Sequence, residues 1–212
     1  LNKNGKFIFE EPYMGSMFKK TSYDQIYDEH IFMFSASSVS KTFELFGLYL
    51  NDAIPQITHG GSMRYVVSKK YSISKRLNRI IKNEKKYKID KIDAALKFKK
   101  DCKNSKDLLR KKIFNFKKKG KKICGYGATS QSTTILNYCN INHNHIDFIC
   151  DTTPEKQNKF SPGAHIPIKS MDYFYKNIPS HIYLFAWNHK KEIFKKEKKI
   201  MKKVKWFSHV IL

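Results

Sequence analysis

The run Tyr27-Asp28-Glu29-His30 places a phenol, two carboxylates and an imidazole within four consecutive residues. Imidazole is the usual general base near neutral pH, and a neighbouring carboxylate can orient it and raise its basicity. A surface histidine beside acidic residues is also common in proteins where it has no catalytic role. The residues alone therefore leave acid/base catalysis and an ordinary surface loop as open interpretations.

Polar groups beside glycine or at the ends of strand-like runs form a second set of candidates. In His59-Gly60-Gly61-Ser62 an imidazole precedes two glycines that let a ligand approach the backbone closely. A simple hairpin turn explains the same residues. Ser161-Pro162-Gly163-Ala164-His165 and Trp187-Asn188-His189 also suit a nucleotide base or a sugar without being diagnostic of either.

The segment Gly125-Tyr126-Gly127-Ala128-Thr129-Ser130 follows a strand-like run and opens a helical one. Backbone N–H groups at such a turn, together with the helix dipole, can hold a phosphate. Asp151 comes about 20 residues later, where a dinucleotide-binding fold places the acid that binds a ribose hydroxyl. Ser130 stands where the third glycine of that fingerprint would be, so a tight turn without a ligand stays open.

Periodicity predicts three regions that position these residues. The first has a strand at 6–10, a loop through Pro12 and Gly15, a helix at 39–46 ending at Gly47, and strands at 48–57 and 63–67 that pair as a hairpin. This order resembles the closing portion of a class I methyltransferase sheet, whose last strand is antiparallel. The second region, 74–119, predicts one or two long amphipathic helices.

The third region alternates strands and helices. We expect strands at 122–127, 146–150, 182–186 and 206–211, with helices at 130–138 and 191–201. Such alternation predicts a parallel α/β domain. Its binding edge lies at the carboxyl ends of the strands, where the glycine turn, Asp151 and Trp187-Asn188 fall.

Composition indicates a folded and strongly basic protein. The chain has 212 residues, 41% hydrophobic, and a formal net charge of +24. Only four of its 42 basic residues are arginines, although phosphate and base recognition depends on the bidentate guanidinium group. The charge is therefore interpreted mostly as solvated surface, and a basic nucleic-acid-binding protein is kept as an alternative.

The cysteines Cys102, Cys124, Cys139 and Cys150 have no CxxC spacing and no histidine at metal-ligand distance, so no metal site is expected. A reducing, cytoplasmic compartment is the simplest interpretation. No apolar run has the length of a membrane span or of a signal-peptide centre. The start without Met, in a strand-like run, suggests a fragment.

An ordered set of motifs spans nearly the whole chain. They are Glu11-Pro12-Tyr13, Tyr23 to His30, Thr58 to Arg64, Gly125 to Thr129, Asp151 to Gln157 and Pro162 to Pro167. Each motif alone is unspecific, but their order resembles the carboxyl-terminal part of the SAM-dependent C-methyltransferases that act on nucleotide-linked 4-keto sugars.

The resemblance implies a fold and a mechanism. Residues 1–70 would be the end of a SAM-methyltransferase domain, 71–119 a helical linker, and 120–212 a Rossmann-like domain that binds the sugar nucleotide. His30 would be the base that removes the proton next to the ketone, with Glu29 orienting it and Tyr27 bonding the sugar. The amino-terminal zinc module and most of the SAM site would lie outside this chain, so a missing amino-terminal half, supplied by another chain or lost by truncation, is expected.

The same resemblance implies substrate contacts from both ends of the chain. They are Tyr13, His59, Gly60, Gly61, Ser62, Gly125, Tyr126, Gly127, Ala128, Thr129, Asp151, His165, Trp187 and Asn188. An NAD-dependent oxidoreductase fragment is the alternative enzyme, because it would use the same glycine turn and distal Asp.

Overall fold

A computed structural model describes residues 1–212, and the chain divides into two compact units. Unit 1 comprises residues 1–22 and 29–101, and unit 2 comprises residues 23–28 and 102–212. The chain therefore passes from one unit to the other three times: between Ser22 and Tyr23, inside the run Tyr27-Asp28-Glu29-His30, and within a long helix.

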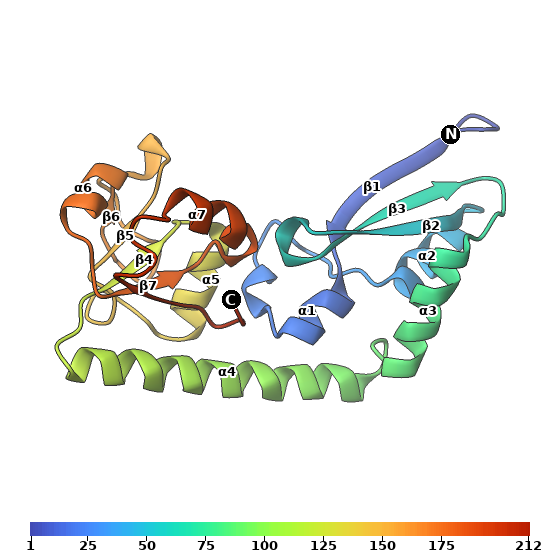
Figure 1. The fold of residues 1–212 in the computed structure, drawn as a ribbon. Helices are drawn as coiled ribbons and strands as arrows, with labels where there is room; N and C mark the ends of the chain where they lie inside the picture. Colours follow the sequence, from blue (N-terminus) through green and yellow to red (C-terminus); the bar gives the residue numbers. More distant parts are fainter. The chain divides into compact units, whose positions relative to one another are not determined.

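Unit 1 is a three-stranded antiparallel sheet with helices beside it (Figure 1). The strands follow the order β1-β3-β2, and the predicted hairpin is confirmed by the pairing of β2 with β3. The elements of this unit are β1 Lys6–Pro12, α1 Met14–Lys20, α2 Ala36–Glu44, β2 Tyr49–Gln56, the 3-10 turn η2 Thr58–Gly60, β3 Ser62–Ser68 and α3 Lys75–Tyr87.

Local sequence explains where these helices begin and end. The Ser35 side chain accepts from the N–H of Ser38 at the start of α2, and Ser74 caps α3 in the same way. The expected loop through Gly15 is wrong, because α1 forms there. No capping side chain marks the start of α1, and burial of Met17 stabilises it, so the sequence carried little signal.

The sequence predicted one or two helices between residues 74 and 119, and the structure has two, α3 and α4 Ile92–Lys118. Helix α4 begins in unit 1, and its residues from Cys102 onward belong to unit 2. Its buried positions, Cys102, Leu109 and Ile113, lie in the unit 2 part at spacings that place them along one side of the helix.

Unit 2 confirms the expected Rossmann-like α/β fold. Its five strands are all parallel and follow the order β6-β5-β4-β7-β8. The elements are η1 Tyr23–Gln25, β4 Ile123–Tyr126, α5 Ser130–Tyr138, β5 Phe148–Cys150, η3 Pro154–Lys156, β6 Ile168–Lys169, α6 Met171–Lys176, β7 His181–Leu184, η4 Trp187–His189, α7 Lys190–Lys196 and β8 Lys205–Phe207. Strand β6 and helix α6 were not predicted, because two and six residues carry too little periodicity.

The strand order reverses between β4 and β7, since β5 and β6 lie on one side of β4 while β7 and β8 lie on the other. Ligands of open α/β sheets bind at such a switch point, beyond the carboxyl ends of the strands. The glycine turn follows β4 at this position, and Trp187-Asn188 follows β7.

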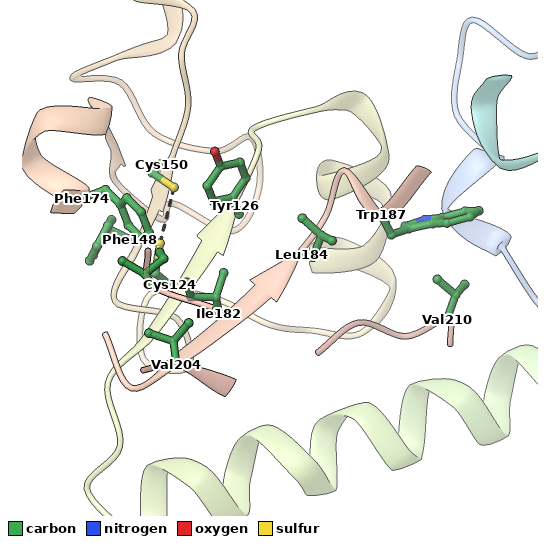
Figure 2. Close-up of a cluster of buried hydrophobic side chains, with 11 residues drawn as sticks. Cys124, Tyr126, Phe148, Cys150, Phe174, Ile182, Leu184, Trp187, Val204 and Val210 are labelled. Atoms are coloured by element: carbon green, nitrogen blue, oxygen red, sulfur yellow. Dashed lines mark hydrogen bonds between the residues drawn. The ribbon is translucent and has the colours of Figure 1, made fainter. Parts of the chain in front are cut away.

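Aromatic and aliphatic side chains from several strands and the chain end form a core in unit 2 (Figure 2). Figure 2 shows Cys124 and Cys150 at one end of this cluster, and Trp187 and Val210 at the other. All four cysteines are buried free thiols, and burial raises the pKa of Cys124 well above its usual range. No helix of the chain is both long enough and apolar enough to cross a bilayer.

Candidate functional site

Two predicted histidines, 29 positions apart, come together in unit 1. The rings of His30 and His59 lie 6.2 Å apart between centroids and are perpendicular to each other. His59 is exposed and His30 is half-buried, so both imidazoles can meet solvent. Neighbouring imidazoles that reach solvent can take and return protons near neutral pH.

The turn that carries His59 is built by hydrogen bonds among its own residues. The Ser62 hydroxyl donates to the Thr58 carbonyl at 3.0 Å, and the N–H of Gly61 donates to the same oxygen at 2.8 Å. The Lys20 ammonium group donates to the Gly60 carbonyl. His59 itself has φ +50°, in the left-handed region, so the turn holds its backbone in an uncommon conformation.

Gly61 is required by both conformation and space. Its φ is +132°, and a Cβ at this position would lie 2.6 Å from the Ser16 hydroxyl oxygen. Its carbonyl accepts from the N–H of Tyr13 at 3.1 Å, which ties the turn to the end of β1. The predicted glycines therefore shape the support of His59.

Glu10 is a carboxylate beside this turn that the sequence did not single out. The Thr58 hydroxyl donates to its Oε1, and Arg64 Nη2 donates to its Oε2 at 3.0 Å. The Thr58 hydrogen bond, with smaller contributions from Arg64 and His59, lowers the pKa of Glu10 below its ordinary value of 4.5. Glu10 is therefore ionised at neutral pH.

The predicted substrate contact Tyr13 makes its contacts within unit 1. Its hydroxyl donates to Glu84 at 2.9 Å, and burial with the charge of Glu84 raises its pKa far above the usual range. Its ring also lies against Gly15, where a Cβ would come within 2.6 Å of the ring. The Tyr13 ring therefore fills the β1–α1 turn.

Close packing explains the glycines of the glycine turn in unit 2. A Cβ on Gly125 would lie 2.5 Å from the Phe185 ring, so this glycine permits close packing of neighbouring strands. The hydroxyl of Tyr126 donates to the buried Glu197 at 2.8 Å. Gly127 has φ +91°, and a Cβ added at this position would lie 3.2 Å from the Ala186 side chain, at the switch point between β4 and β7.

Asp151 supports this turn from the end of β5. Its Oδ2 accepts from the N–H of Ala128 at 2.6 Å, and its Oδ1 accepts from the N–H of Thr153 at 2.8 Å. Lys156 Nζ donates to the Ala128 carbonyl at 2.8 Å, which fixes the same turn from the other side. A ribose hydroxyl at Asp151 would have to share oxygens that already hold the backbone.

Backbone donors remain available where α5 begins. The Thr129 side chain accepts from the N–H of Ser132, while the N–H groups of Ser130 and Gln131 make no hydrogen bond within the chain. Asn188, beyond β7, has a buried Oδ1 without a hydrogen-bond partner. Two backbone donors and one buried acceptor thus occur in segments that follow the switch-point strands.

A family model described as the C-methyltransferase C-terminal domain matches residues 57–211, more than half of the chain. The chain belongs to this family. It is also similar to the C-methyltransferase NovU of Streptomyces niveus, with 29% identity over 204 residues, which are 95% of this chain and 49% of that protein. The chain thus spans about half the length of the curated relative that it matches.

In this C-methyltransferase C-terminal domain, the predicted substrate contact Trp187 has a partner within the chain. Its Nε1 donates to Asp24 Oδ2 at 2.7 Å, and Asp24 Oδ1 accepts from His209 Nε2 at 3.0 Å. Sequence reasoning gave no role to Asp24, although it lies in the motif from Tyr23 to His30, and none to His209, because 185 positions separate the two residues.

The remaining predicted residues of the C-methyltransferase chain are placed as follows. Tyr27 lies in unit 2 and is half-buried, whereas Glu29 lies in unit 1 and is exposed. His165 is exposed, with φ +51°, in the loop between β5 and β6. No group of three or more His, Cys, Asp or Glu side chains is arranged to hold a metal ion.

Proposed function

We propose that this chain supplies the acid/base residues and the sugar-nucleotide site of an enzyme that methylates the carbon next to the ketone of a nucleotide-linked 4-keto-deoxysugar. SAM supplies the electrophilic methyl group in such a reaction. The observation that carries the proposal is the pairing of His30 with His59 in a member of the C-methyltransferase family.

His30 is proposed to remove the proton from the carbon next to the ketone, at one of its ring nitrogens. A hydrogen next to a ketone is acidic enough for a positioned imidazole to remove it, leaving an enolate. Glu29 is proposed to orient His30, and the neighbouring His59 to contact the sugar or exchange the proton with solvent.

The nucleotide diphosphate is proposed to bind where α5 begins. The N–H groups of Ser130 and Gln131 are directed away from the helix body and make no bond within the chain, so they suit phosphate oxygens. Thr129 and Gly127 allow a close approach of the ligand, and Asn188 Oδ1 can accept an N–H from the base or a hydroxyl from a sugar. These contacts would bind the nucleotide part of the substrate.

Proton abstraction can be tested without a methyl donor. The chain is incubated in D2O with a thymidine diphosphate 4-keto-6-deoxysugar, and mass spectrometry follows deuterium entering the carbon next to the ketone. We expect exchange above the buffer rate, and a loss of about 10²–10⁴-fold in His30→Gln. His143→Gln, which alters an exposed histidine in the α5–β5 loop, is the matched control and keeps the wild-type rate.

The proposal is wrong if wild-type protein exchanges no faster than buffer. It is equally wrong if His30→Gln and His143→Gln exchange at the same rate as wild type, because the base would then be another group.

A further inference from the structure

The 3-10 turn η1, Tyr23–Gln25, is buried although it contains a charged residue. Tyr23 is 4% exposed, Asp24 0% and Gln25 1%, and the next residue, Ile26, returns to the surface. A carboxylate leaves water only where strong donors replace its hydration. The burial of Asp24 therefore requires a dedicated site in unit 2.

That site is formed at the carboxyl ends of β7 and β8. Trp187 follows β7 and His209 follows β8, and each donates to one oxygen of Asp24, at 2.7 and 3.0 Å. The Tyr183 hydroxyl lies 2.9 Å from His209 Nδ1. Side-chain exposure is 1% for His209 and 0% for Asp24, so water does not compete for these bonds.

The partners fix the tautomer of His209. A carboxylate can only accept, so His209 Nε2 carries the hydrogen that faces Asp24. The Tyr183 hydroxyl can then donate to Nδ1. Burial, with smaller effects from Tyr23 and Asp24, raises the pKa of Tyr183 well above its usual value, so its hydroxyl keeps this hydrogen.

The turn η1, which contains Asp24, lies along helix α5, and the chain there runs from the end of α5 toward its first residue. The Tyr23 ring lies 5.1 Å from that of Tyr138 at the end of α5, and the Ile26 carbonyl accepts from Thr134 one turn earlier. Four helical residues rise about 6 Å, and Ser130 lies a further four residues back along the helix. The next residue of the chain, Tyr27, is thus carried toward the first turn of α5.

We propose that Asp24, held by His209 and Trp187, is a positioning residue that fixes Tyr27 near the start of α5 so that Tyr27 meets the sugar of a bound sugar nucleotide. This inference rests on the proposed function for its ligand. Trp187 and His209, at the carboxyl ends of β7 and β8, then hold the chain's own turn, while Asn188 and the start of α5 stay available to the nucleotide.

The test compares His209→Gln with His181→Gln, which removes another buried histidine of unit 2. His181 bonds Ser180 at 2.9 Å and contacts the Phe116 ring, and neither residue belongs to η1. Amide hydrogen–deuterium exchange is measured for peptides covering residues 23–28. The rate and the half-saturating concentration of keto-sugar exchange are measured on the same samples.

We expect His209→Gln to speed amide exchange at residues 23–28 at least tenfold and to lower the maximal rate of keto-sugar exchange about 10-fold to 100-fold. We expect His181→Gln to leave both quantities unchanged. His209→Asn should restore neither the amide protection of residues 23–28 nor the rate of keto-sugar exchange. Asp24→Asn, which keeps the shape but loses the charge, shows the same pattern as His209→Gln.

Unchanged amide exchange in both His209→Gln and Asp24→Asn overturns the proposal. A loosened turn with a wild-type maximal rate also overturns it, since Asp24 would then act in folding alone. If wild-type protein shows no keto-sugar exchange, the proposed function fails. The affinity for the sugar nucleotide is then measured in place of the exchange rate. An unchanged affinity in a variant whose η1 turn is loosened overturns the positioning role.

Discussion

Backbone strain and close contact coincide at Gly61, which supports the turn that carries His59. We expect Gly61→Ala to lower the free energy of unfolding by about 2–4 kcal/mol, because φ +132° is unfavourable for alanine and the new Cβ would meet Ser16. Urea unfolding followed by far-UV circular dichroism measures the change.

Gly47→Ala is the matched control, since Gly47 also has positive φ but nothing within 4 Å of the added Cβ. It should cost only about 1 kcal/mol. Equal losses in the two variants would show that contact with Ser16 contributes nothing.

Glu10 should make stability depend on pH in the acid range. Its pKa is lowered in the folded protein by the Thr58 hydrogen bond and by Arg64, so its contribution is present above the ordinary value of 4.5. That contribution is lost as pH falls through the folded pKa. The loss is modest, because the side chain is partly solvated.

Thermal melts of wild type and Glu10→Gln between about pH 6 and pH 3 measure this effect. We expect the melting temperatures to differ at pH 6 and to converge on acidification. A constant difference across this range would contradict the assignment.

At the scale of elements, the start of α2 depends on a carboxylate from α3. Glu84, 3% exposed, accepts from the N–H groups of Ala36 and Ser37 at 2.7 and 2.8 Å, and from the Tyr13 hydroxyl. Anionic groups are stabilising at a helix N-terminus, and these donors would otherwise be buried without an acceptor. Glu84 therefore joins β1, α2 and α3.

Glu84→Ala should lower the free energy of unfolding by about 3 kcal/mol, and Glu84→Gln by about 1–2 kcal/mol because the amide keeps one acceptor. Chemical denaturation measures both. Glu44→Ala, at the exposed end of α2, is the control and should change stability by less than about 0.5 kcal/mol. A loss in Glu84→Ala no larger than in Glu44→Ala would contradict the capping role.

At the scale of the whole molecule, ligand choice separates the two enzyme interpretations. We expect calorimetric titration to show binding of a thymidine diphosphate sugar, because Ser130 and Gln131 offer donors for a diphosphate. We expect no binding of NADH, because the oxygens of Asp151 that would bind its ribose hydroxyl already accept from the N–H groups of Ala128 and Thr153. Ser130→Glu, which sets a carboxylate at the first position of α5, should abolish binding without unfolding the helix. Ser130→Ala should retain it.

Binding of NADH alone would favour the oxidoreductase. Sugar-nucleotide binding that survives Ser130→Glu would place the diphosphate elsewhere.

The net charge of +24 should not make the chain a specific nucleic-acid binder. Its lysines are distributed over α3, α4 and α7, and a dispersed charge neutralises phosphates without reading bases. We expect duplex DNA to bind no tighter than about 1 μM at physiological salt, with no preference among sequences. Fluorescence anisotropy at several salt concentrations tests this, and nanomolar affinity for one sequence would overturn it.

The sequence by itself determined the parallel α/β character of unit 2, the hairpin of unit 1 and the two helices between residues 74 and 119. These features depend on local periodicity, on capping residues such as Ser74, and on turn glycines such as Gly127. Each signal acts over a few residues, so it is visible without knowledge of the fold. The sequence did not predict helix α1, because burial of Met17 rather than a local cap stabilises this helix.

Only the tertiary structure decided which groups meet. It paired His30 with His59, bound Asp24 to His209 and Trp187, and engaged Asp151 with the N–H of Ala128. Such contacts join residues up to 185 positions apart. Their hydrogen bonds depend on distances of a few ångströms that strand order and packing set, and no local pattern of residue types encodes those distances.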